Sequence, residues 1–215
     1  VNLIREYNSS FLKNHGSDIL TNLTFDKDWG LGSSSTLISN LASLSGVDPY
    51  LLNNKIFKGS GYDIACANSI SPIVYRLNKG QNIINEVSFK PPFYEKIYFI
   101  YLNKKQSSIS EVENYKNNKV SESVINEISN ITSMILQCKS IEAYDKLLES
   151  HVLIISNLIS KPTIKESLFK DFNGSIKSLG AWGGDMIMAT SHSNPNNYFI
   201  EKGYSTIFKF EELLV

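Results

Sequence analysis

The chain has 215 residues, of which 42% are hydrophobic and 20% charged, and its 21 Lys and Arg residues balance its 21 Asp and Glu residues. This is an ordinary globular composition, with enough apolar side chains for one large or two modest cores. A neutral chain without a basic block is a poor candidate for a nucleic-acid-binding protein, because that affinity comes mainly from phosphate neutralisation. We expect a small-molecule substrate and no nucleic-acid partner.

The sequence also argues against membrane insertion and structural disulfides. The longest apolar run, residues 97–102, is long enough only for a buried strand, and the opening residues do not resemble a signal peptide. Cys66 and Cys138 lack metal-type spacing, so we interpret them as reduced thiols of a cytoplasmic protein. Because Val1 already lies inside a helical pattern, we expect that an N-terminal piece is missing. Formation of a homodimer is left open.

The first half of the chain carries both helical and strand-like patterns. Apolar periodicity and capping signals predict helices over residues 3–12, 34–46, 48–57 and 63–68. Apolar runs and alternation predict strands over residues 19–25, 73–77, 83–89 and 96–102. Pro91-Pro92 is the best candidate boundary, so we expect one domain over residues 1–92 and another over 93–215.

The second half is mostly helical. The predicted helices cover residues 110–117, 121–137, 141–159, 163–171 and 198–202. The predicted strands cover residues 176–179, 186–190 and 205–210. Strands mixed with helices in runs predict an α+β protein with two layers.

A glycine and serine loop, Gly30-Leu31-Gly32-Ser33-Ser34-Ser35, lies between the first predicted strand and the helix that follows it. Glycines let the backbone approach an anion, and the free amides and dipole of a helix start favour negative charge. A hydroxyl of the loop can also ligate magnesium. The loop is no Walker motif, because no Lys precedes its serines, and it is a poor dinucleotide fingerprint. A capped helix start with a glycine turn remains the alternative.

Two further segments carry glycines beside an aspartate. Asp63, in Ser60-Gly61-Tyr62-Asp63, opens a predicted helix whose dipole would keep the carboxylate ionised, as suits a group that orients or deprotonates a substrate hydroxyl. The alternative is that Asp63 caps its own helix. The loop at residues 177–185 could lie against a phosphate or a nucleotide, or could be a hairpin connection with glycine turns.

Taken together, these segments resemble the motifs of the GHMP kinase superfamily in their family order. Residues 30–35 resemble the ATP-phosphate loop, Ser60-Gly61-Tyr62-Asp63 resembles the segment with the catalytic aspartate, and Gly180-Ala181-Trp182-Gly183-Gly184 resembles the third motif. The string Gly61-Tyr62-Asp63-Ile64-Ala65 is most similar to the bacterial GYDIA family, whose relatives are mevalonate and phosphomevalonate kinases.

The resemblance implies an ATP-dependent kinase that uses Mg²⁺ and transfers the γ-phosphoryl group to an alcohol or phosphate acceptor, mevalonate or phosphomevalonate, in isoprenoid biosynthesis. Asp63 would be the catalytic base, and Ser34 the magnesium ligand. The residues implied to bind the nucleotide are Gly30, Leu31, Gly32, Ser33, Ser34, Ser35, Gly183 and Gly184. The implied fold is α+β with two domains: an N-terminal mixed α/β domain, truncated at its start, and a ferredoxin-like C-terminal domain.

The chain departs from the family pattern in three places. The family's N-terminal motif is absent, residues 51–57 offer no acid for the magnesium site, and Trp182 and Asp185 replace smaller residues. These departures keep a second hypothesis open, a catalytically degenerate nucleotide-binding module with a regulatory role. A purely structural α+β domain is the third.

Two other side chains have alternative interpretations. His151 falls on the apolar stripe of the helix predicted at residues 141–159, so we interpret it as a packing histidine. Tyr62 adjoins Asp63 and could line a substrate pocket or make an aromatic core contact.

Overall fold

The computed structural model describes residues 1–14, 16–57, 59–78, 80–104, 120–180, 182 and 184–214. The chain divides into two compact units, Val1–Lys27 with Leu31–Phe89 and Asp28–Gly30 with Lys90–Val215. The identification of residues 1–92 as a truncated ATP-binding domain and of 93–215 as a GHMP kinase C-terminal domain stays a prediction.

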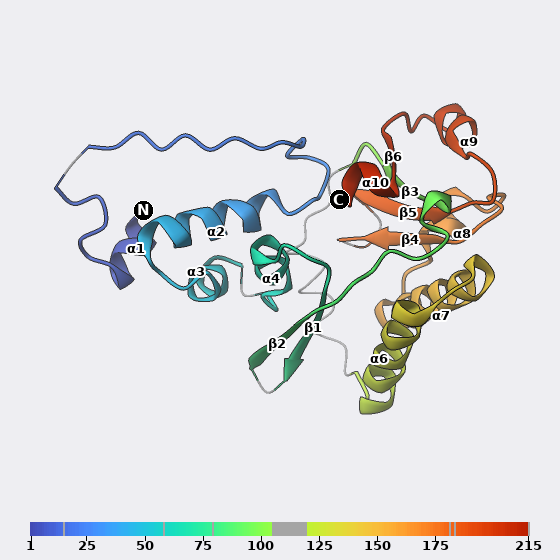
Figure 1. Ribbon diagram of the computed structural model, residues 1–215, viewed down its shortest axis with the longest axis horizontal. Helices are drawn as coiled ribbons and strands as arrows, with labels where there is room; N and C mark the ends of the chain where they lie inside the picture. The colour runs from blue at the N-terminus through green and yellow to red at the C-terminus, as the bar shows by residue number, and fades with distance from the viewer. Residues whose placement is uncertain are drawn as a thin grey trace. The chain divides into compact units, whose positions relative to one another are not determined.

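The first unit packs short helices against one another and adds a β-hairpin (Figure 1). Its elements are α1 (Asn2–Tyr7), α2 (Ser33–Ser45), α3 (Pro49–Ile56), α4 (Tyr62–Asn68), β1 (Ile73–Asn78) and β2 (Gln81–Glu86). The hairpin is antiparallel, and Asn78 pairs with Gln81 beside its turn. A core of seven buried side chains joins the helices: Ile4, Phe11, Ile38, Ala42, Val47, Leu52 and Ile64.

The capping signals of the first unit are confirmed. Gly46 ends α2 in the left-handed conformation, with φ of 65°. Asp48 caps α3, because its carboxylate accepts a hydrogen bond from the amide of Tyr50 at 2.7 Å. These signals were readable from sequence because each involves residues only a few positions apart.

The strand predicted over residues 19–25 is wrong. The chain there is extended, but the described strands form sheets without it. Leu20 is 95% exposed, so the apolar alternation does not reflect a buried face. A strand exists only with a hydrogen-bonded partner, which local sequence does not specify.

Three elements of the first half have different bounds from those predicted. The helix predicted over 3–12 ends at Tyr7. The side chain of Asn8 accepts a hydrogen bond from the amide of Ser10 and donates one to the carbonyl of Ser45. These two hydrogen bonds stabilise a turn in place of further helix. The strand predicted over 83–89 covers residues 81–86. The strand predicted over 96–102 covers residues 97–101.

The second unit is built on a four-stranded sheet in the order β4-β5-β3-β6. Its strands are β3 (Ile97–Tyr101), β4 (Ile176–Leu179), β5 (Met186–Thr190) and β6 (Ile207–Lys209). All neighbouring strands are antiparallel. Since β3 and β4 both run antiparallel to β5, which lies between them, they are parallel to each other and form a split βαβ arrangement.

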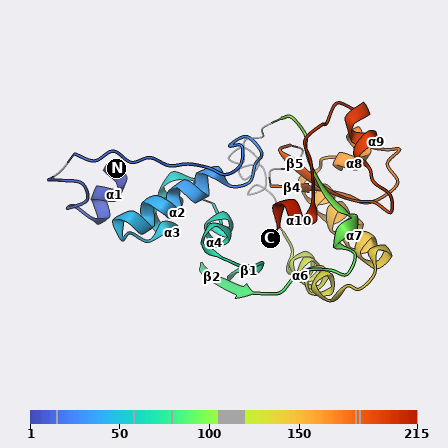
Figure 2. The same cartoon turned by 45° about the horizontal axis from the view of Figure 1, so that its top comes forward.

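Helices connect and cover these strands. Between β3 and β4 lie α6 (Glu122–Gln137), α7 (Ile141–Ile159) and α8 (Ile164–Leu168), and between β5 and β6 lies α9 (Asn196–Glu201). Helices α6 and α7 lie side by side (Figure 2). The short elements η1 (Tyr94–Lys96) and α10 (Phe210–Leu213) flank β3 and β6. The helix predicted over 110–117 lies outside the described residues.

The core of the second unit surrounds the central strands β3 and β5. Every residue of β5 is buried, as are the first four of β3. Helix α7 has the predicted bounds, and Ser140 caps it by accepting from the amide of Ala143. Helix α8 is shorter than the predicted 163–171, because Phe169 turns out of the helix into the core, where it is fully buried.

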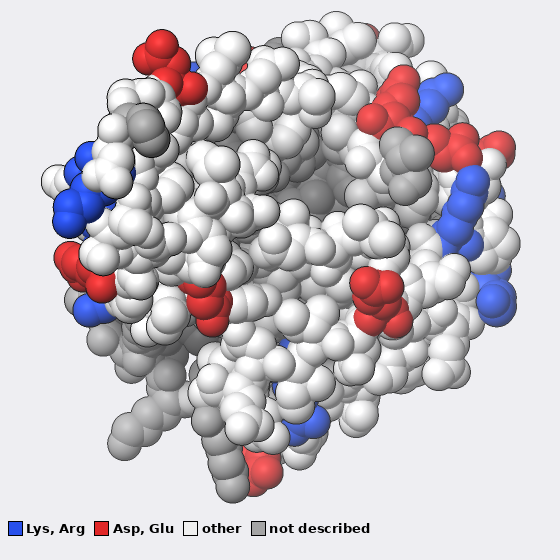
Figure 3. Space-filling view, turned by 60° about the vertical axis from the view of Figure 1, so that its left-hand side comes forward, with Lys and Arg blue, Asp and Glu red and all other residues white. Residues whose placement is uncertain are grey.

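The described surface carries no large block of one charge on the face shown in Figure 3, where Lys and Arg side chains lie in small groups beside Asp and Glu. Among the described residues, no helix is both long and apolar enough to span a membrane. Cys66 and Cys138 are free thiols.

Candidate functional site

The glycine and serine loop begins within the second unit. The ring of Trp29 makes an edge contact with Phe208, with 4.7 Å between ring centroids. Gly30 follows with φ of 72°, and a Cβ on it would lie 2.4 Å from Cβ of Asp185. Only glycine fits there, because both the left-handed backbone and the close approach exclude a side chain.

The end of the loop belongs to the first unit and starts α2. Gly32 is the N-cap, with φ of 81°, and no side chain caps the first-turn amides. The hydroxyls of Ser35 and Thr36 donate back to the carbonyl of Gly32, at 2.8 and 3.0 Å. The alternative of a serine-capped helix start is therefore not what the structure shows: no side chain caps the amides at the positive dipole end of this thirteen-residue helix.

The three serines of the loop have different surroundings. Ser35 is buried. Ser33 donates to the carbonyl of Lys27 at 3.3 Å. The hydroxyl of Ser34 is exposed and has no hydrogen bond to any described residue, which fits a group available to a phosphate or to a magnesium ion.

A cavity of about 210 Å³ lies against this helix start. It is lined by Ser33, Ser34, Thr36, Leu37 and Asn40 of α2 and by residues 21–23 of the extended segment. Four hydroxyl-bearing residues, two asparagines and two leucines thus line a space beside the helix start. The extended segment, wrongly predicted as a strand, contributes a wall of this cavity.

Asp63 lies in the first turn of α4 and does not cap it. The N-cap is Gly61, with φ of 84°, and no side chain makes a capping hydrogen bond. Desolvation raises the pKa of the Asp63 carboxyl above its usual value, although the residue as a whole reaches the surface. We expected the helix dipole to favour the ionised form; desolvation of the carboxyl group acts in the opposite direction.

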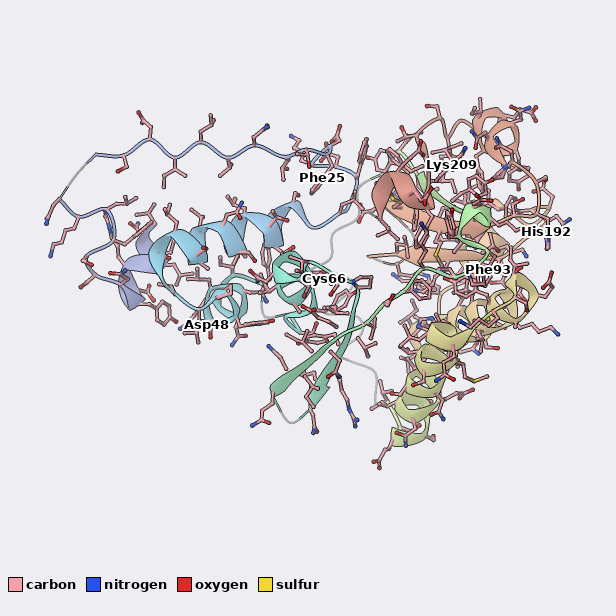
Figure 4. All side chains as sticks on the ribbon, viewed as in Figure 1. Phe25, Asp48, Cys66, Phe93, His192 and Lys209 are labelled. Atoms are coloured by element: carbon pink, nitrogen blue, oxygen red, sulfur yellow. The ribbon has the colours of Figure 1, made fainter. Side chains whose placement is uncertain are left out.

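Aromatic side chains surround the segment before Asp63. Tyr62 is 49% exposed, so it is not a core residue, and its ring makes an edge contact with Tyr75 at 5.7 Å. Burial raises the pKa of the Tyr62 phenol, as does its hydrogen bond with Cys66, which lies one turn further along α4 (Figure 4). Tyr50 contacts the same segment, since a Cβ on Gly61 would lie 2.9 Å from its ring.

The glycine loop of the second unit connects β4 with β5, so the hairpin interpretation describes its topology. Gly183 and Ala181 lie outside the described residues, whereas Gly184 is buried. Trp182 donates from Nε1 to the carbonyl of Pro162 at 3.3 Å, which anchors the loop within its own unit.

Sequence reasoning missed the role of Asp185. It is 5% exposed, has φ of 52°, and its backbone continues the sheet by bonding to Lys104 and Leu102 at 2.8 Å each. Its side chain packs on Gly30 and lies near Gly180. The first and third glycine segments thus meet inside the second unit.

The predicted site residues are divided between the units. Leu31, Gly32, the three serines and Asp63 belong to the first unit, and Gly30 and Gly184 to the second. Within the first unit α2 and α4 pack together, with Asn68 donating to Ser39 Oγ at 3.2 Å. No cluster of three or more His, Cys, Asp or Glu residues suited to a metal occurs in the described part of the chain.

Comparisons with known proteins show that the fold of this chain is similar to those of two solved structures. No protein-family model and no curated protein matches the chain. A Listeria innocua protein, Lin0012, has 17% identity and a TM-score of 0.61 over 98% of this chain and 74% of that one. Mevalonate kinase from L. major, solved with R-mevalonate, has 16% identity and a TM-score of 0.54 over 83% of this chain. The match spans 64% of that kinase, less than two thirds of its length. The chain therefore has a fold similar to that of a mevalonate kinase.

Proposed function

We propose that this protein is an ATP-dependent small-molecule kinase of the GHMP type. The observation that carries the proposal is the uncapped, glycine-led start of α2, packed in one unit with the helix that presents Asp63. An anion site in the same packed unit as a carboxylate of raised pKa suits phosphoryl transfer. The fold likeness to a mevalonate kinase supports the same conclusion.

The finer assignments belong to this proposal. The β-α-β-β-α-β order of the second unit supports a ferredoxin-like C-terminal domain. The Gly61-Tyr62-Asp63-Ile64-Ala65 string supports the GYDIA family, and with it mevalonate or phosphomevalonate as acceptor. A cytoplasmic location and the oligomeric state stay predictions.

Each residue has a role in the proposed transfer. The amides of Gly32 to Ser35 hold the phosphates of ATP. Ser34 would ligate magnesium, which would neutralise phosphate charge. Asp63 takes the proton of the acceptor hydroxyl or orients it while that oxygen bonds to the γ-phosphorus and ADP leaves with the bridging oxygen. The resemblance alone assigns Gly183 and Gly184 to nucleotide binding. Catalysis then comes from positioning and charge neutralisation.

The proposal is tested by incubating the complete protein with ATP, magnesium and a panel of acceptors: mevalonate, phosphomevalonate and sugars. We expect ADP formation that depends on one acceptor. No acceptor-dependent ADP formation across the panel would contradict the kinase assignment. If magnesium-ATP still stabilised the protein in that case, the degenerate nucleotide-binding module would be the better description.

A binding measurement tests the anion site separately. Magnesium-ATP at about 100 times its dissociation constant should stabilise the protein by about 2.7 kcal/mol. Ser34→Ala should weaken this stabilisation, whereas Ser43→Ala, an exposed serine of the same helix, should leave it unchanged. Equal effects of the two substitutions would remove Ser34 from the site.

A further inference from the structure

The turn that precedes Asp63 is enclosed between two tyrosines. Gly61 has φ of 84°, and a Cβ on it would lie 2.9 Å from the Tyr50 ring and 3.4 Å from the Tyr75 hydroxyl. A side chain at this position would have to displace one of the rings. The turn is therefore held from two directions, by α3 through Tyr50 and by β1 through Tyr75.

The Tyr75 hydroxyl makes the polar connection to this turn. It donates to the carbonyl of Ser60 and lies 2.9 Å from the side-chain amide of Asn82 on β2. The Tyr75 hydroxyl is thus placed to donate its single proton to the Ser60 carbonyl or to the Oδ1 atom of Asn82. The result is a chain of hydrogen bonds from the β-hairpin to the turn.

Other hydrogen bonds at the turn are local. The Ser60 hydroxyl accepts from the amide of Tyr62 at 3.3 Å, and the Gly61 carbonyl accepts from Ala65 at 3.0 Å. Among the described residues, the Tyr75 bond is the one that ties Ser60 or Gly61 to a distant part of the chain. Tyr75 also contacts the next residue along, through its edge contact with the Tyr62 ring.

The far end of α4 is fixed independently. Ile64 and Ala65 are buried, and Asn68 bonds to Ser39 on α2. Asp63 lies between this fixed part and the turn. The position of its carboxylate therefore depends on the packed end of α4 and on the turn, and the β-hairpin holds the turn through Tyr75.

We propose that Tyr75 is a positioning residue for Asp63: its hydroxyl holds the Ser60 carbonyl and thereby fixes the turn from which Asp63 meets the phosphoryl acceptor. This role rests on the proposed kinase function. Tyr75 acts through the turn and not on the reacting atoms. Because a displacement of about 1 Å can lower a rate by about 100-fold, loss of this single bond has a measurable consequence.

Tyr75→Phe removes the hydroxyl and keeps the ring that contacts Tyr62. We expect kcat to fall by about 10-fold or more while KM for ATP stays within about twofold, since the nucleotide loop on α2 is untouched. The matched control is Tyr198→Phe, which removes a 2.8 Å hydrogen bond to Asp171 in the second unit. The control should retain wild-type kcat.

Two readouts separate positioning from a general loss of stability. Hydrogen exchange of the amides at residues 60–66 should become faster in Tyr75→Phe. The acid limb of the kcat profile should move to lower pH, because a loosened turn hydrates the Asp63 carboxyl and lowers its raised pKa. A fall in kcat with an unchanged acid limb and unchanged exchange would overturn the positioning role.

The outcomes also distinguish this inference from the function on which it rests. Turnover that is lost in Asp63→Asn but unchanged in Tyr75→Phe would overturn the role of Tyr75 alone. Turnover that is unchanged in Asp63→Asn would overturn the proposed site itself. Losses in both variants, with the Tyr198→Phe control active, support both.

Discussion

His151 on α7 should make the second unit sensitive to acid. Its Nδ1 atom is buried and has no hydrogen-bond partner among the described residues. Burial and, to a smaller extent, the nearby Lys177 ammonium together lower the pKa of its imidazole to about 4. Because the unfolded chain has an ordinary His pKa of about 6.5, it binds more protons than the folded chain between these values. Stability should therefore fall as pH falls through this window.

The size of the effect follows from the two pKa values. Without solvent screening, this shift corresponds to a loss of about 2.4 kcal/mol of stability between about pH 7 and about pH 4.5. Since His151 is only half-buried, solvent screening reduces this toward about 1 kcal/mol. His151→Leu replaces the imidazole with an apolar side chain of similar size on the apolar stripe of α7, and so removes the titrating group. The stability difference between variant and wild type should thus grow by about 1 to 2.4 kcal/mol on acidification.

Both tryptophans, Trp29 and Trp182, belong to the second unit, so denaturant unfolding followed by tryptophan fluorescence reports on the unit that contains His151. Comparing variant with wild type cancels the titration of other groups, such as Asp145, whose pKa burial raises. His192→Leu, which removes an exposed imidazole beside Glu142, controls for the loss of a histidine. A difference between His151→Leu and wild type that did not change with pH would refute the reasoning.

Three further substitutions test the packing that supports the site. Gly174→Ala should destabilise the second unit by about 3 kcal/mol or more, because φ is 156° and a Cβ would lie 2.0 Å from the carbonyl oxygen of Thr190; an unchanged fluorescence midpoint would contradict this. Thr163→Ala should lower the free energy of unfolding by about 1 kcal/mol, because it removes the capping box of α8. Tryptophan-fluorescence unfolding measures this change, and an equal effect of Ser160→Ala would argue against the cap. Asp48→Ala should speed hydrogen exchange in α3 by an amount corresponding to about 1 kcal/mol and leave the tryptophan transition of the second unit unchanged.

Local signals explain what the sequence predicted well. The caps at Gly46 and Asp48 and the strongly periodic helix α7 depend on residues within one or two turns of each other. The buried strands β3 and β5 were visible as short apolar runs. In each case, neighbouring residues alone determine the backbone conformation or the buried face.

Features that depend on distant residues were not predictable in the same way. The extended segment at residues 19–25 has strand-like alternation, but pairing is a property of the whole fold. The approach of Asp185 to Gly30 joins two motifs far apart in the chain, and their glycines hinted only that some close contact was needed. The same holds for the bond from Tyr75 to Ser60.

The sequence placed Asp63 at a helix start, and the structure adds the desolvation of its carboxyl group. A dipole argument uses only the position of the residue in its helix, whereas desolvation depends on the packing around α4. The direction of this shift fits the proposed role, because a carboxylate of raised pKa is a better proton acceptor.

In the proposed function, Asp63 serves phosphoryl transfer in the same unit as the anion site at the start of α2. It is tested most directly by measuring phosphorylated product by mass spectrometry for wild type and Asp63→Asn, with ATP, magnesium and the acceptor found in the panel. We predict that wild type forms the product and that Asp63→Asn lowers kcat by about 100-fold or more while binding of magnesium-ATP is retained. Product formation by Asp63→Asn at the wild-type rate would contradict the account.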